Sequence, residues 1–358
     1  MYGPQTKKAQ RIIQRALLSS PDEDGEKEVD LTSVANITCV PPIPEGIHVI
    51  NIKGMKNVKG VSSLPSTLKF LDARGTSLTS LPDTLPNMRS LFIDETSISS
   101  LPQLPETLVK LSIDRCNKLK SIVLPPKLEN FYCRFTGLKE FPSLPDSVEF
   151  LEFASHGYPQ CSLSTIYEIS GIKLPDILIP LPPLPPRLEY LKWYVKEGEI
   201  WPSPDAWPET LVDLDLEGSQ CRAIPSLPKR LQRLLIENTN IQKLPELPLT
   251  LFRLNAGPSL ERIPPFHEGM RAFTISSYSI KPTDLPPIPS TMRHMLVKKK
   301  VYSGEDEILF EMDDGEIKKD TDQILEKQGF RKWSGPKFYL KMSVCMAGNC
   351  HCGLENSQ

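Results

Sequence analysis

The amino-acid sequence predicts an α/β-type solenoid, an elongated horseshoe of short parallel strands and extended return segments, and three observations predict it. A block of about twenty residues recurs along most of the 358-residue chain, most clearly as LPQLPETLVKLSIDRCNKLKS at 101–121. Within each block the apolar residues alternate, as in a strand with one buried face. Prolines follow each alternating run and stop the strand, because proline lacks the N–H group. This regular period predicts one stacked unit instead of separate globular domains.

The period and the L-x-x-L-x-L core are typical of a leucine-rich repeat, in which each turn of the solenoid, here called a rung, contributes one strand. The first core residue of each block recurs in steps of 18 to 23 residues and gives about 13 rungs between residues 41 and 299. These residues are Ile50, Leu71, Leu91, Leu111, Phe131, Leu151, Ile169, Leu191, Leu214, Leu234, Leu254, Phe273 and Met295. The pattern fades near 155–179, where we expect a degenerate rung that carries a loop.

Residues 1–40 are predicted to close the N-terminal end of the solenoid. The segment TKKAQRIIQRALL at 6–18 places its apolar residues, among them Ile13 and Leu17, on one side of a short amphipathic helix. Open solenoid ends need such a cap. The alternative is a basic membrane-surface or targeting helix, which the acidic run PDEDGEKEVD at 21–30 disfavours. We expect that run to be a solvated linker.

The prolines predict a polyproline-like return on the convex side of the horseshoe. Pairs three residues apart, such as Pro102 and Pro105, recur in many blocks. The segment PLPPLPPRL at 180–188 also matches P-x-x-P-x-R, a pattern that SH3 domains bind. Because the repeat itself supplies these residues, we interpret the match as scaffold.

Residues 300–358 predict a small α+β cap or subdomain with a flexible tail. Residues 308–317 read as a strand, an Asp-Asp-Gly turn and a second strand; 320–330 as a short helix with Asp320 as N-cap; and 337–342 as another strand. The tail holds the candidate zinc ligands Cys345, Cys350, His351 and Cys352. Three adjacent ligands would converge poorly on one ion, so we predict no metal and no cofactor.

Composition and motifs exclude several function classes. A net charge of −2 gives no excess of positive charge that would bind nucleic acid. No apolar run is long enough to span a membrane. The sequence has no G-x-S-x-G motif and no glycine-rich phosphate loop, and its five histidines are scattered. We therefore predict that the protein is not an enzyme. The alternative is an enzyme or enzyme adaptor, ubiquitin-ligase-like or zinc-binding, whose chemistry lies in the tail.

The cysteines favour a reducing compartment. Cys116 and Cys221 occupy core positions of their blocks, and we expect both to be buried thiols without a disulfide. No apolar signal segment opens the chain, so Sec export is disfavoured, while export by another route stays open.

The residues that flank the inward leucines are predicted to form a concave surface that binds a protein partner. Aromatic and arginine side chains anchor interfaces, and the carboxylates of 213, 215 and 217 on one rung would repel one another unless a basic partner or solvent compensates. The alternative is an ion-pair ladder, in which these charged side chains pair with one another across the strands and require no partner. The candidates are Phe70, Asp72, Arg74, Phe92, Asp94, Asp114, Tyr132, Arg134, Tyr190, Lys192, Tyr194, Asp213, Asp215 and Glu217. Nothing in the sequence predicts an oligomeric state.

The block LPxLPxxLxxLxIxxTxLxxLP resembles the LPX-type leucine-rich repeat of bacterial type III secreted effectors over residues 41–299. The family has Asn where this chain has Thr76, Thr96, Cys116, Thr136 and Thr239. The resemblance implies a helical N-terminal cap and delivery into the host cytoplasm by a non-Sec route. One branch adds a ubiquitin ligase domain with a catalytic Cys-x-Asp, and no cysteine here has Asp two residues later. The chain therefore resembles the repeat-only branch, whose members bind host signalling proteins.

Overall fold

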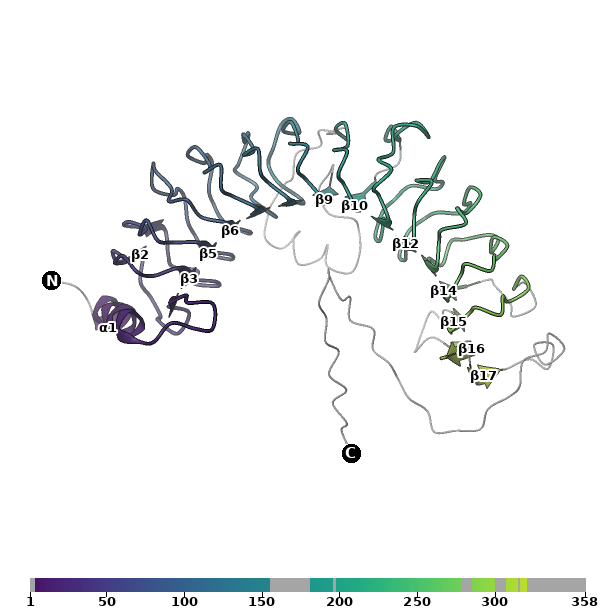
Figure 1. The fold of residues 1–358 in the computed structure, drawn as a ribbon, viewed down its shortest axis with the longest axis horizontal. Helices are drawn as coiled ribbons and strands as arrows, with labels where there is room; N and C mark the ends of the chain where they lie inside the picture. The colour runs from purple at the N-terminus through teal and green to yellow at the C-terminus, as the bar shows by residue number, and fades with distance from the viewer. Residues whose placement is uncertain are drawn as a thin grey trace.

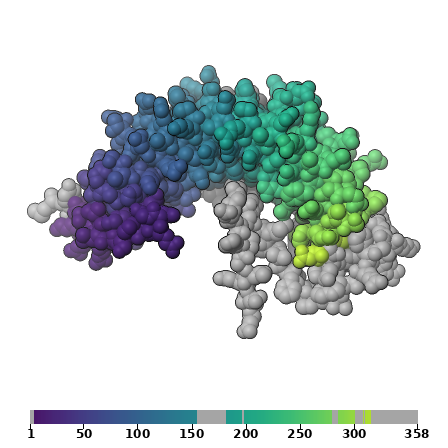
Figure 2. Space-filling model, viewed as in Figure 1, coloured from purple at the N-terminus to yellow at the C-terminus, as the bar shows by residue number. Residues whose placement is uncertain are grey.

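The computed structural model describes residues 4–154, 181–195, 198–278, 285–299, 307–314 and 316–320. These residues form an arc, with a 15-stranded sheet along its inner edge and the return segments along its outer edge (Figure 1). The space-filling view shows the same arc hollowed on the strand side (Figure 2). The predicted leucine-rich-repeat horseshoe is confirmed.

The sheet is parallel except for its last two strands. Its strands are β1 (Glu28–Asp30), β3 (Val49–Asn51), β5 (Phe70–Asp72), β6 (Ser90–Phe92), β7 (Lys110–Ser112), β8 (Asn130–Cys133), β9 (Phe150–Ala154), β10 (Tyr190–Tyr194), β11 (Asp213–Asp215), β12 (Arg233–Ile236), β13 (Arg253–Ala256), β14 (Ala272–Ser277), β15 (His294–Lys299), β16 (Glu307–Asp313) and β17 (Glu316–Asp320). Two further strands, β2 (Cys39–Val40) and β4 (Gly60–Val61), pair separately.

The core of the solenoid is a stack of inward apolar residues in register. Leu71 pairs with Leu91, Leu91 with Leu111, and Leu111 with Phe131, and all four are fully buried. Burying one such side chain stabilises the fold by roughly 1.5–3 kcal/mol. Each rung shares this core with its neighbours, so the stability of the array rests on the contacts between rungs.

The second proline of each pair turns the chain toward the next strand. Its carbonyl accepts a hydrogen bond from the N–H group three residues on, as from Leu108 to Pro105 at 3.0 Å and from Leu188 to Pro185 at 3.2 Å. Leu188 is buried, and Arg187 forms an ion pair with Glu149. The P-x-x-P-x-R residues therefore serve the repeat, as interpreted from the sequence.

Strands β3, β5, β6, β7 and β8 end in the same bend. The residue at the bend has positive φ, for example Gly75 (67°), Glu95 (58°) and Arg115 (58°). The residue after it is buried and bonds to a backbone carbonyl: Thr76 Oγ1 donates to Ala73 O at 2.8 Å, and Cys116 Sγ donates to Ile93 O at 3.1 Å. Thr76 and Cys116 thus hold the bend on their rungs through these bonds.

Helix α1 (Pro4–Leu18) covers the first rung, as predicted. Ala9 and Ile13 are buried against the core, and the last turn is held by Lys27, whose Nζ donates to Leu17 O at 2.6 Å. The expectation of a solvated linker over all of 21–30 is wrong for its last three residues. They form β1, which pairs with β3, because Val29 turns inward to full burial while its acidic neighbours point out.

The expected degenerate rung between Leu151 and Leu191 is also wrong. Strands β9 and β10 pair directly along five residues, from Phe150 with Tyr190 to Ala154 with Tyr194, so no strand lies between them. A parallel pair accepts a connection of any length above about a dozen residues. The intervening sequence lacks the L-x-x-L-x-L core that a rung requires.

At the C-terminal end the predicted hairpin is present. Strand β16 pairs antiparallel with β15, and β17 pairs antiparallel with β16. Asp320 is the last residue of β17, and the helix and strand expected beyond it lie outside the described residues. No helix among the described residues is long and apolar enough to cross a membrane.

Candidate functional site

Three rows of side chains cover the concave face of the sheet. The leading row holds the residue before each inward core residue, the middle row the residue after it, and the trailing row the residue three after it. In β5 these are Phe70, Asp72 and Arg74, while Leu71 and Ala73 point into the core. The cross-strand register carries the rows from strand to strand, so all predicted site residues share this face.

Aromatic rings form a continuous cluster in the middle of the face. Phe150 stacks on Tyr190 with ring centroids 4.1 Å apart and an interplanar angle of 3°, and it contacts Tyr132 at 5.0 Å. We call Tyr132, Phe150 and Tyr190 the central aromatic cluster. Beside it, Phe135 contacts Tyr194 at 5.4 Å. Each aromatic pair contributes about 0.5–1.5 kcal/mol beyond burial, so the rings are held in place before any partner arrives.

A second aromatic pair lies toward the N-terminal end of the arc. Phe70 and Phe92 meet edge to face at 5.3 Å. The guanidinium of Arg74 lies 5.2 Å from the Phe92 ring centroid and also pairs with Asp72 at 2.5 Å. Arg74 thus bonds to its own strand and not to Asp94, so the trailing row is not a continuous ion-pair ladder.

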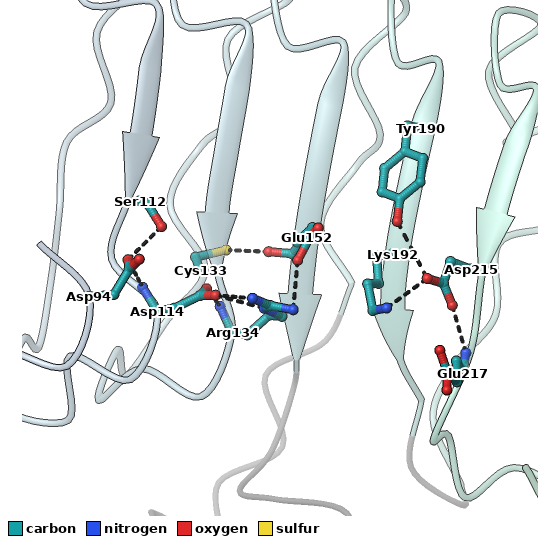
Figure 3. A network of polar contacts seen from close by, with 10 residues as sticks. All are labelled: Asp94, Ser112, Asp114, Cys133, Arg134, Glu152, Tyr190, Lys192, Asp215 and Glu217. Carbon is teal, nitrogen blue, oxygen red and sulfur yellow. Dashed lines mark hydrogen bonds and ion pairs between the residues drawn. The ribbon is translucent and has the colours of Figure 1, made fainter. Parts of the chain in front are cut away.

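Arg134 organises the polar contacts between β7 and β9 (Figure 3). It forms a two-nitrogen contact with Asp114 Oδ2, one arm at 2.7 Å, and its Nη1 lies 2.8 Å from Glu152 Oε2. Glu152 is almost fully buried, and burial raises the pKa of its carboxyl although Arg134 lowers it. Burial likewise raises the pKa of the Cys133 thiol, which donates to the backbone carbonyl of Glu152 at 3.4 Å.

Lys192 performs the same role between β10 and β11. Its Nζ lies 2.7 Å from Asp215 Oδ2 and 5.6 Å from the centroid of the Tyr194 ring. Tyr190 Oη donates to the same carboxylate at 3.4 Å. Burial, and next the Asp215 charge, raise the pKa of Tyr190 above its usual range, so this phenol stays protonated and donates.

Cations of the sheet itself, and not a partner or solvent, compensate two of the three carboxylates 213, 215 and 217. Asp213 pairs with Arg233 and Asp215 with Lys192. Asp72, Asp114, Asp213 and Asp215 are each less than a tenth exposed. These four groups position their neighbours and offer little surface to a partner.

Asp94 is different from the other carboxylates. Its Oδ1 accepts hydrogen bonds from Ser112 Oγ at 2.5 Å and from the Asp114 N–H at 2.9 Å. Within the described part of the chain it has no ion pair. Burial raises the pKa of Asp94 to about 6, and the nearby Asp114 charge adds to the effect.

Sequence reasoning missed several residues of this face, chiefly Phe150 and Glu152 on β9, Arg233 on β12 and Glu237 directly after β12. The signal was present, since each lies one before, one after or three after an inward leucine. Applying the row rule to every rung, and not only to those with conspicuous charges, finds all four.

The structure does not test the cysteine and histidine ligands considered for zinc. The candidates Cys345, Cys350, His351 and Cys352 lie outside the described residues. Of the described cysteines, Cys116, Cys133 and Cys221 are buried, as predicted for Cys116 and Cys221, and only Cys39 is exposed. One group on β15 and the following hairpin, His294 with Asp313 and Asp314, has donor atoms within 4.8 Å of one another. The ion pair of His294 with Asp313 at 2.7 Å accounts for this closeness.

No family model matches the sequence. Among curated proteins, the chain is 29% identical to disease resistance protein RRS1 of Arabidopsis thaliana over 241 residues, and 27% identical to disease resistance protein RPS4B of the same plant over 198 residues. These matches cover 64% and 51% of this chain but only 18% and 16% of the plant proteins. The chain thus spans less than a fifth of their length.

Among solved structures, the chain is similar to YopM, a leucine-rich effector protein from Yersinia pestis. The TM-score is 0.54 at 21% sequence identity, and the match covers 82% of this chain and 89% of YopM. An identity this low speaks for the fold alone. The chain has the leucine-rich-repeat fold.

Proposed function

We propose that this protein is a non-enzymatic scaffold that binds a protein partner through its concave face, and that it is a secreted bacterial effector that modulates host signalling in the cytoplasm of a host cell. The central aromatic cluster carries the proposal. Its rings lie on the concave face of the sheet, and Tyr132 and Tyr190 are partly exposed there. Preorganised Tyr rings are frequent interface anchors because they bury large area at low entropic cost.

The remaining concave residues support the same function. The charged side chains are fixed by Arg134, Lys192 and Arg233, so the face is rigid and its contacts are ordered in advance. The effector role is proposed by analogy with YopM, a leucine-rich effector protein that has the same fold. The tail chemistry of the enzyme alternative rests on residues outside the described part of the chain.

The test is cross-linking and affinity capture from host-cell cytosol with the full chain, the variant Tyr190→Ala with Tyr194→Ala, and a matched control. The control, Val123→Ala with Leu249→Ala, removes two side chains of the return segments that are 87% and 80% exposed. We expect one defined partner that is cross-linked to strands β8–β11, lost with the tyrosine variant and retained with the control.

Thermal unfolding of all three proteins checks that loss of binding is not loss of folding. Capture that is unchanged in the tyrosine variant, or cross-links that map to the return segments, would refute the concave face as the binding surface.

A further inference from the structure

We infer that the concave face between β6 and β12 takes an extended basic polypeptide segment, whose Lys or Arg side chains pair with Asp94 at one end and with Glu217 and Glu237 at the other. The middle of the segment then lies across the central aromatic cluster. This inference rests on the proposed function, since it names the chemistry of the partner at the same face.

The charge balance of the face is the first argument. The three rows of β6–β12 hold seven carboxylates, namely Asp94, Asp114, Glu152, Asp213, Asp215, Glu217 and Glu237, and four cations, namely Lys110, Arg134, Lys192 and Arg233, which gives a net charge of −3. Three of the cations are already paired within the sheet. The excess charge of the face is therefore negative, and it lies on the carboxylates of Asp94, Glu217 and Glu237.

Asp94 marks one end of this excess charge. Its two hydrogen bonds, from Ser112 and the Asp114 backbone, both reach Oδ1, and among the described residues no donor reaches Oδ2. The nearest arginine of its row, Arg74, is turned to Asp72. A cation from outside can meet the second oxygen, where a charge-assisted hydrogen bond is about twice as strong as a neutral one.

Glu217 and Glu237 mark the other end. They are neighbours in the trailing row, because the Gly218 N–H donates to Glu237 O at 3.1 Å across β11 and β12. In the part of the chain that the structure describes, their carboxylates accept hydrogen bonds from side-chain amides, from Asn238 to Glu217 at 3.2 Å and from Asn255 to Glu237 at 3.0 Å. Burial, and next the Glu217 charge, raise the pKa of Glu237, while the Asn255 hydrogen bond and the charges of Arg253 and Lys298 lower it. The two like charges lie side by side without an ion pair in the described residues, which favours a cation shared between them.

The rings between the two ends suit the same ligand. Lys192 already lies 5.6 Å above the Tyr194 ring, within the range of cation–π attraction. Continuing the register of β10 and β11 places Tyr194 beside Glu217. A lysine or arginine that enters there meets a ring face and a carboxylate together.

The spacing gives the length of the segment. Neighbouring strands lie about 4.8 Å apart, so the five or six intervals from β6 to β11 or β12 span roughly 24–29 Å. An extended chain advances about 3.4 Å per residue. The two basic anchors are therefore about seven to nine residues apart in the segment.

The experiment uses the full chain to select from a displayed library of random twelve-residue peptides. We expect the selected peptides to carry Lys or Arg at two positions seven to nine residues apart, with aromatic or proline residues between them. Binding of one selected peptide is then measured by fluorescence anisotropy. The variant Asp94→Asn, Glu217→Gln, Glu237→Gln should weaken it at least tenfold, and 300 mM salt should weaken wild-type binding relative to 50 mM salt.

The matched control is Lys110→Gln, a charge removal of the opposite sign on the leading row of β7. It should leave affinity unchanged or raise it. Selection of no peptides, selection without basic residues, or affinity that survives the triple variant would overturn the inference. A partner that is lost with the tyrosine variant of the previous section but retained by the triple variant leaves the proposed function standing and removes this inference alone.

Discussion

Replacing Asp94 by Asn tests whether the concave face holds an uncompensated charge. Both hydrogen bonds of Asp94 end on Oδ1, which an amide oxygen can replace, while the negative charge disappears. The substitution therefore isolates the cost of burying the charge. We expect the variant to be more stable than the wild type at pH 8.

The magnitude follows from the pKa of Asp94, which burial raises from 3.8 to about 6. The folded protein binds this proton more tightly than the unfolded chain does, so the stability contribution of the group is fully present below pH 3.8. It is lost as the pH rises to 6 and stays constant above that. Two pKa units correspond to about 3 kcal/mol, which solvent screening and the weaker neutral hydrogen bonds reduce to about 1–2 kcal/mol.

The assay is urea unfolding of wild type and variant at pH 8 and pH 4, followed by circular dichroism. The free energy of unfolding of the variant should exceed that of the wild type by about 1–2 kcal/mol at pH 8 and match it at pH 4. A control variant, Asp205→Asn, changes a carboxylate that is 90% exposed and should show no difference at either pH. An Asp94→Asn variant that is less stable at pH 8, or whose effect is the same at both pH values, would show that the charge is compensated.

Two further predictions concern the scaffold. Gly137→Ala should lower the free energy of unfolding by about 2 kcal/mol or more, because a Cβ at this position would lie 2.0 Å from Asn117 O. The control Gly60→Ala, whose Cβ would have its nearest neighbour 4.0 Å away, should change the free energy of unfolding by less than about 0.5 kcal/mol. Urea unfolding measures both, and equal effects would contradict the packing. At pH 8 iodoacetamide should label Cys39 but neither Cys116 nor Cys221, since burial raises the pKa of Cys116 to about 11 and that of Cys221 to about 12. Peptide mapping by mass spectrometry measures this, and labelling of Cys116 as fast as Cys39 would contradict its burial.

Local alternation explains how much of the site was predictable. The side-chain period of two places Tyr190, Lys192 and Tyr194 on one face and Leu191 on the other whatever the rest of the chain does. For the same reason the inward residues and the buried thiol of Cys116 follow from the block alone. The same alternation places Phe150 and Arg233 on the concave face, so the sequence was sufficient to predict both.

The pairing of charges was not predictable in this way. Arg74 has carboxylates on its own strand and on the next one, and both lie within reach of a flexible side chain. No local pattern decides between the two carboxylates. In the structure the guanidinium pairs with the buried Asp72 and packs against the Phe92 ring. Asp94 is left without an ion pair in the described residues, although the Arg74 charge still lowers its pKa.

The horseshoe, its period, its inward core and the rows of the concave face follow from the repeat pattern alone, because each depends on contacts that recur about every twenty residues. The fold in three dimensions adds that β9 pairs directly with β10, that Val29 begins the sheet, and that Glu217 and Glu237 are neighbours with no ion pair among the described residues. These outcomes depend on contacts between residues far apart in the chain, made once each, and no local pattern records a contact that does not repeat.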